Sequence, residues 1–213
     1  MTIKCDGIIL DVDGTILNTT YIAAESYNKA IVASGYPVEP NITGEILQRE
    51  FGKTMSIIAN NLWPNLTSEQ QMKLMHDSCD ILEKMLQENE KDITYKGVID
   101  TIKSFSKEID FYIVSNCQNG YIELITQKSG LDKYIKDFEC YGRTGKDKAT
   151  NLRMLVERNH LQNPVYVGDT QGDADACAKA EIPFIWAAYG FGQNVPCLKR
   201  IDSFPEIVSL LHK

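Results

Sequence analysis

The sequence predicts an α/β fold, a doubly wound parallel sheet with a helical domain inserted into it, and three observations predict it. A short, wholly apolar run from Gly7 to Leu10 is typical of a strand covered on both faces. From about Thr94 onward, strands alternate with helices, as in a parallel sheet. Between these two stretches, roughly residues 18–93, every element has the pattern of a helix.

The inserted stretch carries clear helix signals. One helix is expected from about Thr20 to Ser34, because Gly35 follows it as a natural C′ residue. A second helix is expected to begin near Thr43. A long helix should start at Thr67, where Thr67-Ser-Glu-Gln70 has the form of a capping box. Its Met and Leu residues recur at helical spacing, which favours a packed face over a ligand surface.

The stretch after Thr94 supplies the rest of the sheet. Strands are expected at 111–115, 138–141, 165–168 and 183–187, and helices up to 130 and at 148–159, 172–180 and 205–211. We therefore predict a discontinuous, Rossmann-like catalytic core made of residues 1–16 and 94–213. Residues 17–93 form the predicted helical cap domain.

The composition and net charge of the chain argue against nucleic acids and membranes as binding partners. The chain has 213 residues, of which 43% are hydrophobic and 24% charged, and its formal net charge is −7. An acidic chain without a Lys/Arg cluster is a weak candidate for binding nucleic acid or an anionic membrane. No apolar run reaches the length of a membrane span. With no long heptad or apolar seam, we expect a monomer.

The cysteines indicate a reducing compartment. There are six of them, and no pair has C-x-x-C spacing, so a zinc site or a redox pair is not expected. The first ten residues hold too short an apolar run for a secretory signal. We therefore expect reduced thiols in a cytoplasmic protein.

Polar side chains follow three of the predicted strands. They are Asp11 and Asp13 after the first strand, Ser115 and Asn116 after the second, and Asp169 and Asp173 after the third. In an open parallel sheet, ligands bind beyond the carboxyl ends of the strands. These side chains are therefore expected to gather at one edge of the sheet.

The chemistry of such a group requires a cation. Up to four carboxylates close together repel one another, and a hard divalent ion such as Mg²⁺ relieves that repulsion. A bound phosphoryl group would meet the cation, a lysine (Lys148 or Lys146) and hydrogen-bond donors including Ser115. Positioning and charge stabilisation are most of what phosphoryl transfer needs.

A carboxylate can also act as the nucleophile. Asp11 ends a strand, so its side chain is held rigidly and can form an aspartyl-phosphate. Asp13, two residues on, can protonate the leaving oxygen and then activate water. Gly14 permits the tight turn that brings the backbone close to the phosphate.

These residues carry a family resemblance. Asp11-Val-Asp-Gly-Thr15, Ser115-Asn116, Lys148 and Gly168-Asp-Thr-Gln-Gly-Asp173 resemble the four ordered motifs of haloacid dehalogenase (HAD) superfamily phosphatases, and the phosphoglycolate phosphatase-like branch in particular. The resemblance covers nearly the whole chain. Each motif alone is weak, but four in order at strand ends or helix starts make coincidence improbable.

The resemblance implies a role for each residue. Asp11 would be nucleophile and metal ligand, and Asp13 acid/base with its carbonyl on the metal. Lys148 would bridge nucleophile and phosphate, Asp169 would bind Mg²⁺, and Asp173 would support the metal through water or a hydrogen bond. The phosphate-binding residues would be Gly14, Thr15, Ser115 and Asn116. Lys148 is preferred to Lys146 because Lys-Ala-Thr-Asn-Leu resembles the family's helix-opening segment.

Alternatives stay open at this point. Asp13 favours phosphate chemistry over dehalogenation, since dehalogenases of the superfamily lack an acid there. A sugar-phosphate mutase shares all four motifs, although the segment 49–54 resembles the phosphatase branch more. A non-catalytic metabolite-binding module is the third possibility. The small phosphorylated substrate itself is not specified, and Cys117 is expected to be a spectator whose pKa the nearby carboxylates raise.

Overall fold

The computed structural model describes residues 2–212 and resolves the chain into two compact units. One unit comprises the residues up to Asn18 and those from Ile93 on, and the other comprises Thr19–Asp92. The chain leaves the first unit and returns to it at adjacent points, because the Asn18 N–H donates to the carbonyl of Ile93 at 2.9 Å. The second unit is thus an insertion between the first strand of the sheet and the rest.

A six-stranded, wholly parallel sheet forms the centre of the first unit. Its strands are β2 (Gly7–Leu10), β3 (Asp110–Ser115), β4 (Ile135–Cys140), β5 (Pro164–Gly168), β6 (Phe184–Ala187) and β7 (Lys199–Ile201), in the order β4-β3-β2-β5-β6-β7. The register pairs Leu10 with both Ile113 and Val167. The carboxyl ends of β2, β3 and β5 therefore lie level at one edge, as the sequence predicts.

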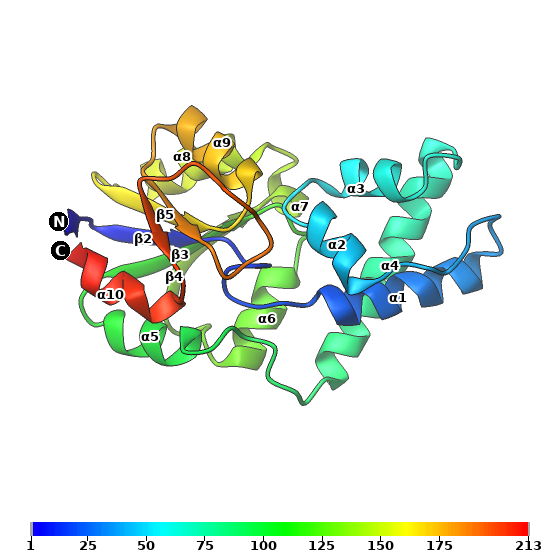
Figure 1. Ribbon diagram of the computed structural model, residues 1–213, viewed down its shortest axis with the longest axis horizontal. Helices are drawn as coiled ribbons and strands as arrows, with labels where there is room; N and C mark the ends of the chain where they lie inside the picture. Colours follow the sequence, from blue (N-terminus) through cyan, green and yellow to red (C-terminus); the bar gives the residue numbers. More distant parts are fainter. Residues whose placement is uncertain (1, 213) are drawn as a thin grey trace. The chain divides into compact units, whose positions relative to one another are not determined.

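Helices cover both faces of this sheet. The helices are α5 (Val98–Phe105), α6 (Tyr121–Ser129), α7 (Tyr141–Thr144), α8 (Lys148–Arg158), α9 (Gln171–Ala180) and α10 (Ile207–Leu210). In Figure 1, α8 and α9 lie along one face and α5 and α10 along the other. Ile8, Ile9 and Leu10 of β2 are wholly buried, which explains why this strand is a continuous apolar run. The predicted doubly wound α/β fold is confirmed.

The inserted unit is helical. Its helices are α1 (Thr20–Ser34), α2 (Gly44–Glu50), α3 (Met55–Leu62) and α4 (Ser68–Glu88). Gly35 ends α1 in the left-handed conformation at φ 65°, and Thr67 and Gln70 form the predicted capping box at the start of α4. The long apolar stripe of α4 is a packed face, since Leu74, Met75 and Leu82 are buried.

The expected helix over 205–211 is wrong in extent. The chain forms a 3₁₀ turn (η1, Phe204–Glu206) and the single turn of α10, and then becomes extended. Strand β8 (Leu211–His212) pairs in parallel with β1 (Ile3–Lys4), and the Cys5 N–H donates to the His212 carbonyl at 2.8 Å. Pairing with the other end of the chain overrides the local helical pattern. Within residues 2–212, no helix combines the length and apolarity needed to cross a bilayer.

Candidate active site

Three buried carboxylates meet at the carboxyl edge of the sheet. One oxygen from each of Asp11, Asp169 and Asp173 lies within 4.8 Å of the others. Asp11 follows β2, Asp169 follows β5, and Asp173 lies in the first turn of α9. All three side chains are at most 2% exposed. The level strand ends described above account for this convergence of residues far apart in the sequence.

Lys148 is the cation inside this group. It is the first residue of α8, and its Nζ donates to Asp11 Oδ1 at 3.0 Å and to Asp173 Oδ1 at 2.5 Å. Only 4% of Lys148 is exposed. Lys146 is exposed, and its Nζ lies 3.6 Å from the Met154 sulfur instead. Of the two lysines that the sequence offers, the structure brings Lys148 to the carboxylates.

Asp173 is occupied by hydrogen bonds from the protein. Its Oδ2 accepts from the Thr170 N–H at 2.9 Å and the Thr170 hydroxyl at 2.7 Å, within a capping box at the start of α9. Its Oδ1 accepts from Lys148, and the Tyr166 hydroxyl oxygen lies 3.4 Å from the same Oδ1. These bonds suit Asp173 to orienting Lys148 and the loop of Asp169 better than to binding a metal ion directly.

Asp169 faces the loop that follows β2. Its Oδ2 accepts the Phe191 N–H at 2.7 Å, and its Oδ1 lies 3.5 Å from the Thr15 hydroxyl. Gly14 adopts φ 89°, and a Cβ there would overlap the Asp169 carboxylate. Only glycine combines this conformation with so close an approach.

The three carboxyl groups differ in how their surroundings shift their pKa values. Burial raises the pKa of Asp11 to about 6, although the ammonium of Lys148 opposes that shift. Burial and the two neighbouring carboxylates raise the pKa of Asp169 well above its usual range. For Asp173, burial alone would raise the pKa, but Lys148 and the bonds from Thr170 outweigh it and lower the pKa. Asp173 is therefore the carboxylate most firmly held in its ionised form.

The group fits a hard divalent cation. Full ionisation of the three carboxylates would set three negative charges against the one ammonium of Lys148, a net charge of −2 in a buried space that a divalent cation would neutralise. The available donors are carboxylate oxygens, the ligand type that Mg²⁺ prefers. Asp11 and Asp169 are the members whose pKa burial raises most clearly, so they gain most from a cation beside them.

The other predicted site residues lie at the same edge but outside the carboxylate group. The Asp13 carboxylate is separate from it and accepts a hydrogen bond from Tyr121 at 3.0 Å. Ser115 ends β3 and is buried, and Asn116 follows it as a half-buried residue. The sheet thus brings all the predicted residues to one edge, and it links Asp11 most directly to Lys148.

Tyrosines around the site were not identified from the sequence. Tyr166 donates to the Val114 carbonyl at 2.9 Å, and Lys148 Nζ lies 5.7 Å from the centre of its ring. Tyr189 donates to the Thr15 carbonyl at 2.9 Å. Neither has a local sequence signal. The Thr170 cap does have one, since Thr170-Gln-Gly-Asp173 has the capping-box form.

Cys117 is protonated, for a reason other than the expected one. Its pKa is raised chiefly by a hydrogen bond with the Cys140 thiol and then by burial, and Asp13 is a smaller cause. The direction agrees with the prediction, whereas the leading cause is a residue 23 positions along the chain, at the end of β4. A protonated thiol is a poor nucleophile.

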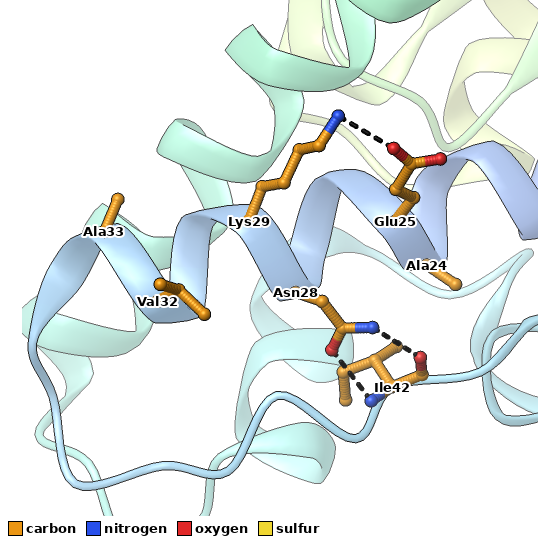
Figure 2. Close-up of a pocket in the computed structure, with 7 residues that line it drawn as sticks. All are labelled: Ala24, Glu25, Asn28, Lys29, Val32, Ala33 and Ile42. Carbon is orange, nitrogen blue, oxygen red and sulfur yellow. Dashed lines mark hydrogen bonds and ion pairs between the residues drawn. The ribbon is translucent and has the colours of Figure 1, made fainter.

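A hollow on the helical unit has different chemistry. It has a volume of about 590 Å³ and lies between α1 and the segment that carries Ile42 (Figure 2). Its Asn28 side chain is bonded to the N–H and C=O of Ile42 at 3.0 and 2.8 Å. Its charged residues, Glu25 and Lys29, form an exposed pair at 2.8 Å. These groups satisfy one another, so the hollow offers no phosphoryl chemistry.

Comparisons with known proteins agree with this geometry. A family model described as haloacid dehalogenase-like hydrolase matches residues 8–187. A phosphoglycolate phosphatase from Photobacterium profundum is 22% identical over 220 residues, covering 96% of this chain and 94% of that protein.

Solved structures share the fold. A haloacid dehalogenase-like hydrolase from Bacteroides fragilis superposes with a TM-score of 0.83 at 17% identity, covering 95% of this chain and 99% of that one. CbbY from Rhodobacter sphaeroides, in complex with phosphate, gives 0.80 at 14% identity, covering 95% and 96%. Because the family model spans most of the sequence, including both aspartate motifs and Lys148, the chain belongs to the haloacid dehalogenase-like hydrolase family.

Proposed function

We propose that this enzyme is a Mg²⁺-dependent phosphatase that hydrolyses a small phosphomonoester through an aspartyl-phosphate on Asp11. The observation that carries the proposal is the buried bridge from Lys148 to Asp11 and Asp173, with Asp169 alongside. A rigid carboxylate at a strand end, next to a fixed cation, is suited to attack on a phosphoryl group.

The residues divide the reaction into two steps. In the first, an Asp11 oxygen forms a bond to phosphorus while the bond from phosphorus to the substrate oxygen breaks. Asp13 gives its proton to that leaving oxygen. In the second, Asp13 takes a proton from water as the water attacks the phosphorus of the aspartyl-phosphate, which releases inorganic phosphate and restores Asp11.

The metal and phosphate contacts are part of the proposal. Asp11, Asp169 and the Asp13 carbonyl would hold Mg²⁺, which would supply positive charge to offset the phosphate, with Asp173 in a supporting role. Lys148 would carry the remaining positive charge to the phosphate. The residues Gly14, Thr15, Ser115 and Asn116 would surround the phosphoryl oxygens. The side-chain hydroxyls of Thr15 and Ser115 and the Asn116 amide are donors suited to an anionic, oxygen-rich group. The N–H groups of Gly14 and Thr15 already donate to the carbonyls of Leu17 and Val12.

The substrate class rests on the relatives. The P. profundum protein is named a phosphoglycolate phosphatase, which makes phosphoglycolate the first substrate to test. We propose a small phosphorylated metabolite of this kind, handled by a monomer in the cytoplasm. All six cysteines are free thiols, which supports a reducing compartment.

The test is a panel of small phosphomonoesters assayed with Mg²⁺, with Asp11→Asn beside the wild type. We expect turnover that chelator removes and that the variant lacks. Asp11→Asn keeps the size of the side chain, so loss of turnover in a folded variant shows that the reaction requires the Asp11 carboxylate. Turnover that survives in the variant rules out the covalent step. An inert wild type would favour a mutase, tested with sugar phosphates and a bisphosphate activator, or a binding module.

A further inference from the structure

Tyr121 places a hydroxyl group on Asp13. It is the first residue of α6, and its hydroxyl donates to Asp13 Oδ1 at 3.0 Å across 108 residues of sequence. Gly120 precedes the helix at φ 87°, a left-handed conformation that sets where the helix begins. Tyr121 and Asp13 both belong to the unit that contains the six-stranded sheet, so this contact lies within one compact unit.

The contact is more specific than packing requires. Tyr121 is 5% exposed, and a phenylalanine ring would fill the same volume. The extra hydroxyl is directed at Asp13, a half-buried carboxylate outside the buried group of Asp11, Asp169 and Asp173. Fixing one oxygen of a carboxyl group restricts rotation of the whole group, and so sets where the second oxygen points.

We propose that Tyr121 is a positioning residue that holds Asp13 for proton transfer to the leaving oxygen. The inference rests on the proposed phosphatase mechanism, in which Asp13 is the general acid. Catalysis by a general acid depends on its placement within hydrogen-bond reach of the oxygen that it protonates. Removal of the Tyr121 hydroxyl lets Asp13 adopt orientations that are not productive.

This role makes a prediction that depends on the leaving group. The leaving group of an alkyl phosphate is a strongly basic alkoxide unless its oxygen is protonated as it leaves. The leaving group of 4-nitrophenyl phosphate, 4-nitrophenolate, departs readily without a proton. When Asp13 is no longer held in place as the general acid, kcat/KM falls for the alkyl ester and stays nearly unchanged for the aryl ester. The second step, hydrolysis of the aspartyl-phosphate, is common to both substrates and does not enter kcat/KM when the first step is irreversible.

The experiment compares Tyr121→Phe with wild type on phosphoglycolate, or on the best alkyl phosphate of the panel, and on 4-nitrophenyl phosphate. We expect kcat/KM to fall by about tenfold for the alkyl ester, and by less than about twofold for the aryl ester. Tyr189→Phe is the matched control, because its hydroxyl bonds to the Thr15 carbonyl and not to a carboxylate. It should change both substrates by the same factor.

An equal loss on both esters, or no loss on either, would overturn the positioning role. Turnover of the aryl ester also reports whether the variant is folded. Asp13→Asn, followed by the burst of 4-nitrophenolate, should show the same selective pattern in stronger form. If it does not, the acid role of Asp13 fails. An inert wild type refutes the phosphatase proposal, and the role of Tyr121 falls with it.

Discussion

Removal of the buried ammonium is the sharpest test of the charge arrangement. Lys148 is 4% exposed and bonds to two carboxylates, so Lys148→Met leaves Asp11 and Asp173 buried without a cation between them. Breaking a buried ion pair by deleting one partner costs about 3–5 kcal/mol. For a chain of this size, that free energy corresponds to a fall in melting temperature of roughly 10 °C.

The loss should depend on pH in a defined direction. The ammonium is among the groups that lower the pKa of both Asp11 and Asp173, so its removal raises both pKa values. A carboxyl group with a raised pKa in the folded state binds its proton more tightly there than in the unfolded chain. The stability of the variant therefore recovers as pH falls. We expect the deficit relative to wild type to be larger at about pH 8 than at about pH 5.5.

The assay is urea denaturation of the full chain in the presence of chelator, with Lys146→Met as the control. Lys146 is exposed and contacts a methionine, so its loss should change the free energy of unfolding by less than about 0.5 kcal/mol. Added Mg²⁺ should restore part of the stability of the Lys148 variant at the higher pH. Equal stabilities for the two variants would refute the reasoning, as would a deficit that grows on acidification.

Three further predictions follow from the site. Protons compete with Mg²⁺ for Asp11, because burial raises the pKa of Asp11 to about 6. The rise in melting temperature on adding Mg²⁺ should therefore shrink as the pH drops through about 6. A rise that stays constant with pH would place the metal elsewhere. Gly14→Ala should abolish that Mg²⁺-induced rise, because the new Cβ overlaps the Asp169 carboxylate. A melting temperature that rises with Mg²⁺ as far as that of the wild type, at the same Mg²⁺ concentrations, would contradict this. Cys117→Ser should keep turnover within about threefold of wild type, since the thiol is held protonated; a loss of about 100-fold or more, on the order expected for a nucleophile, would make it a participant.

The fold could be predicted because its signals are local. The apolar run of β2 reflects burial on both faces, and the alternation after residue 94 reflects the covering helices. Once a parallel sheet is assigned, the carboxyl ends of its strands must share an edge, which brings Asp11 and Asp169 together without further information. The helix predicted over 205–211 is wrong in extent, because the extended end of the chain depends on pairing with residues 3–4, more than 200 positions away.

The surroundings of the site could not be predicted in the same way. Tyr121 and Tyr189 act through single hydroxyl groups, and tyrosine in a helix or loop is most often a packing residue. Their positions depend on how α6 and the loop after β6 approach the strand ends. That approach is a property of tertiary packing, which spacing within the sequence does not encode.

The choice between the two lysines, by contrast, has a local physical basis. The Asp147 side chain accepts the Thr150 N–H at 2.8 Å, which makes Asp147 the N-cap and Lys148 the first residue of α8. Lys146 lies outside the helix and is exposed. A helix that connects two parallel strands begins near the carboxyl end of the first strand. Side chains in its first turn therefore lie at the ligand-binding edge of the sheet. The Asp147-Lys-Ala-Thr150 cap thus fixes which lysine enters the carboxylate group. Replacing that cap should loosen Lys148 from Asp11 before it unfolds the helix, because the rest of α8 is anchored by the buried residues Ala149, Leu152 and Leu155.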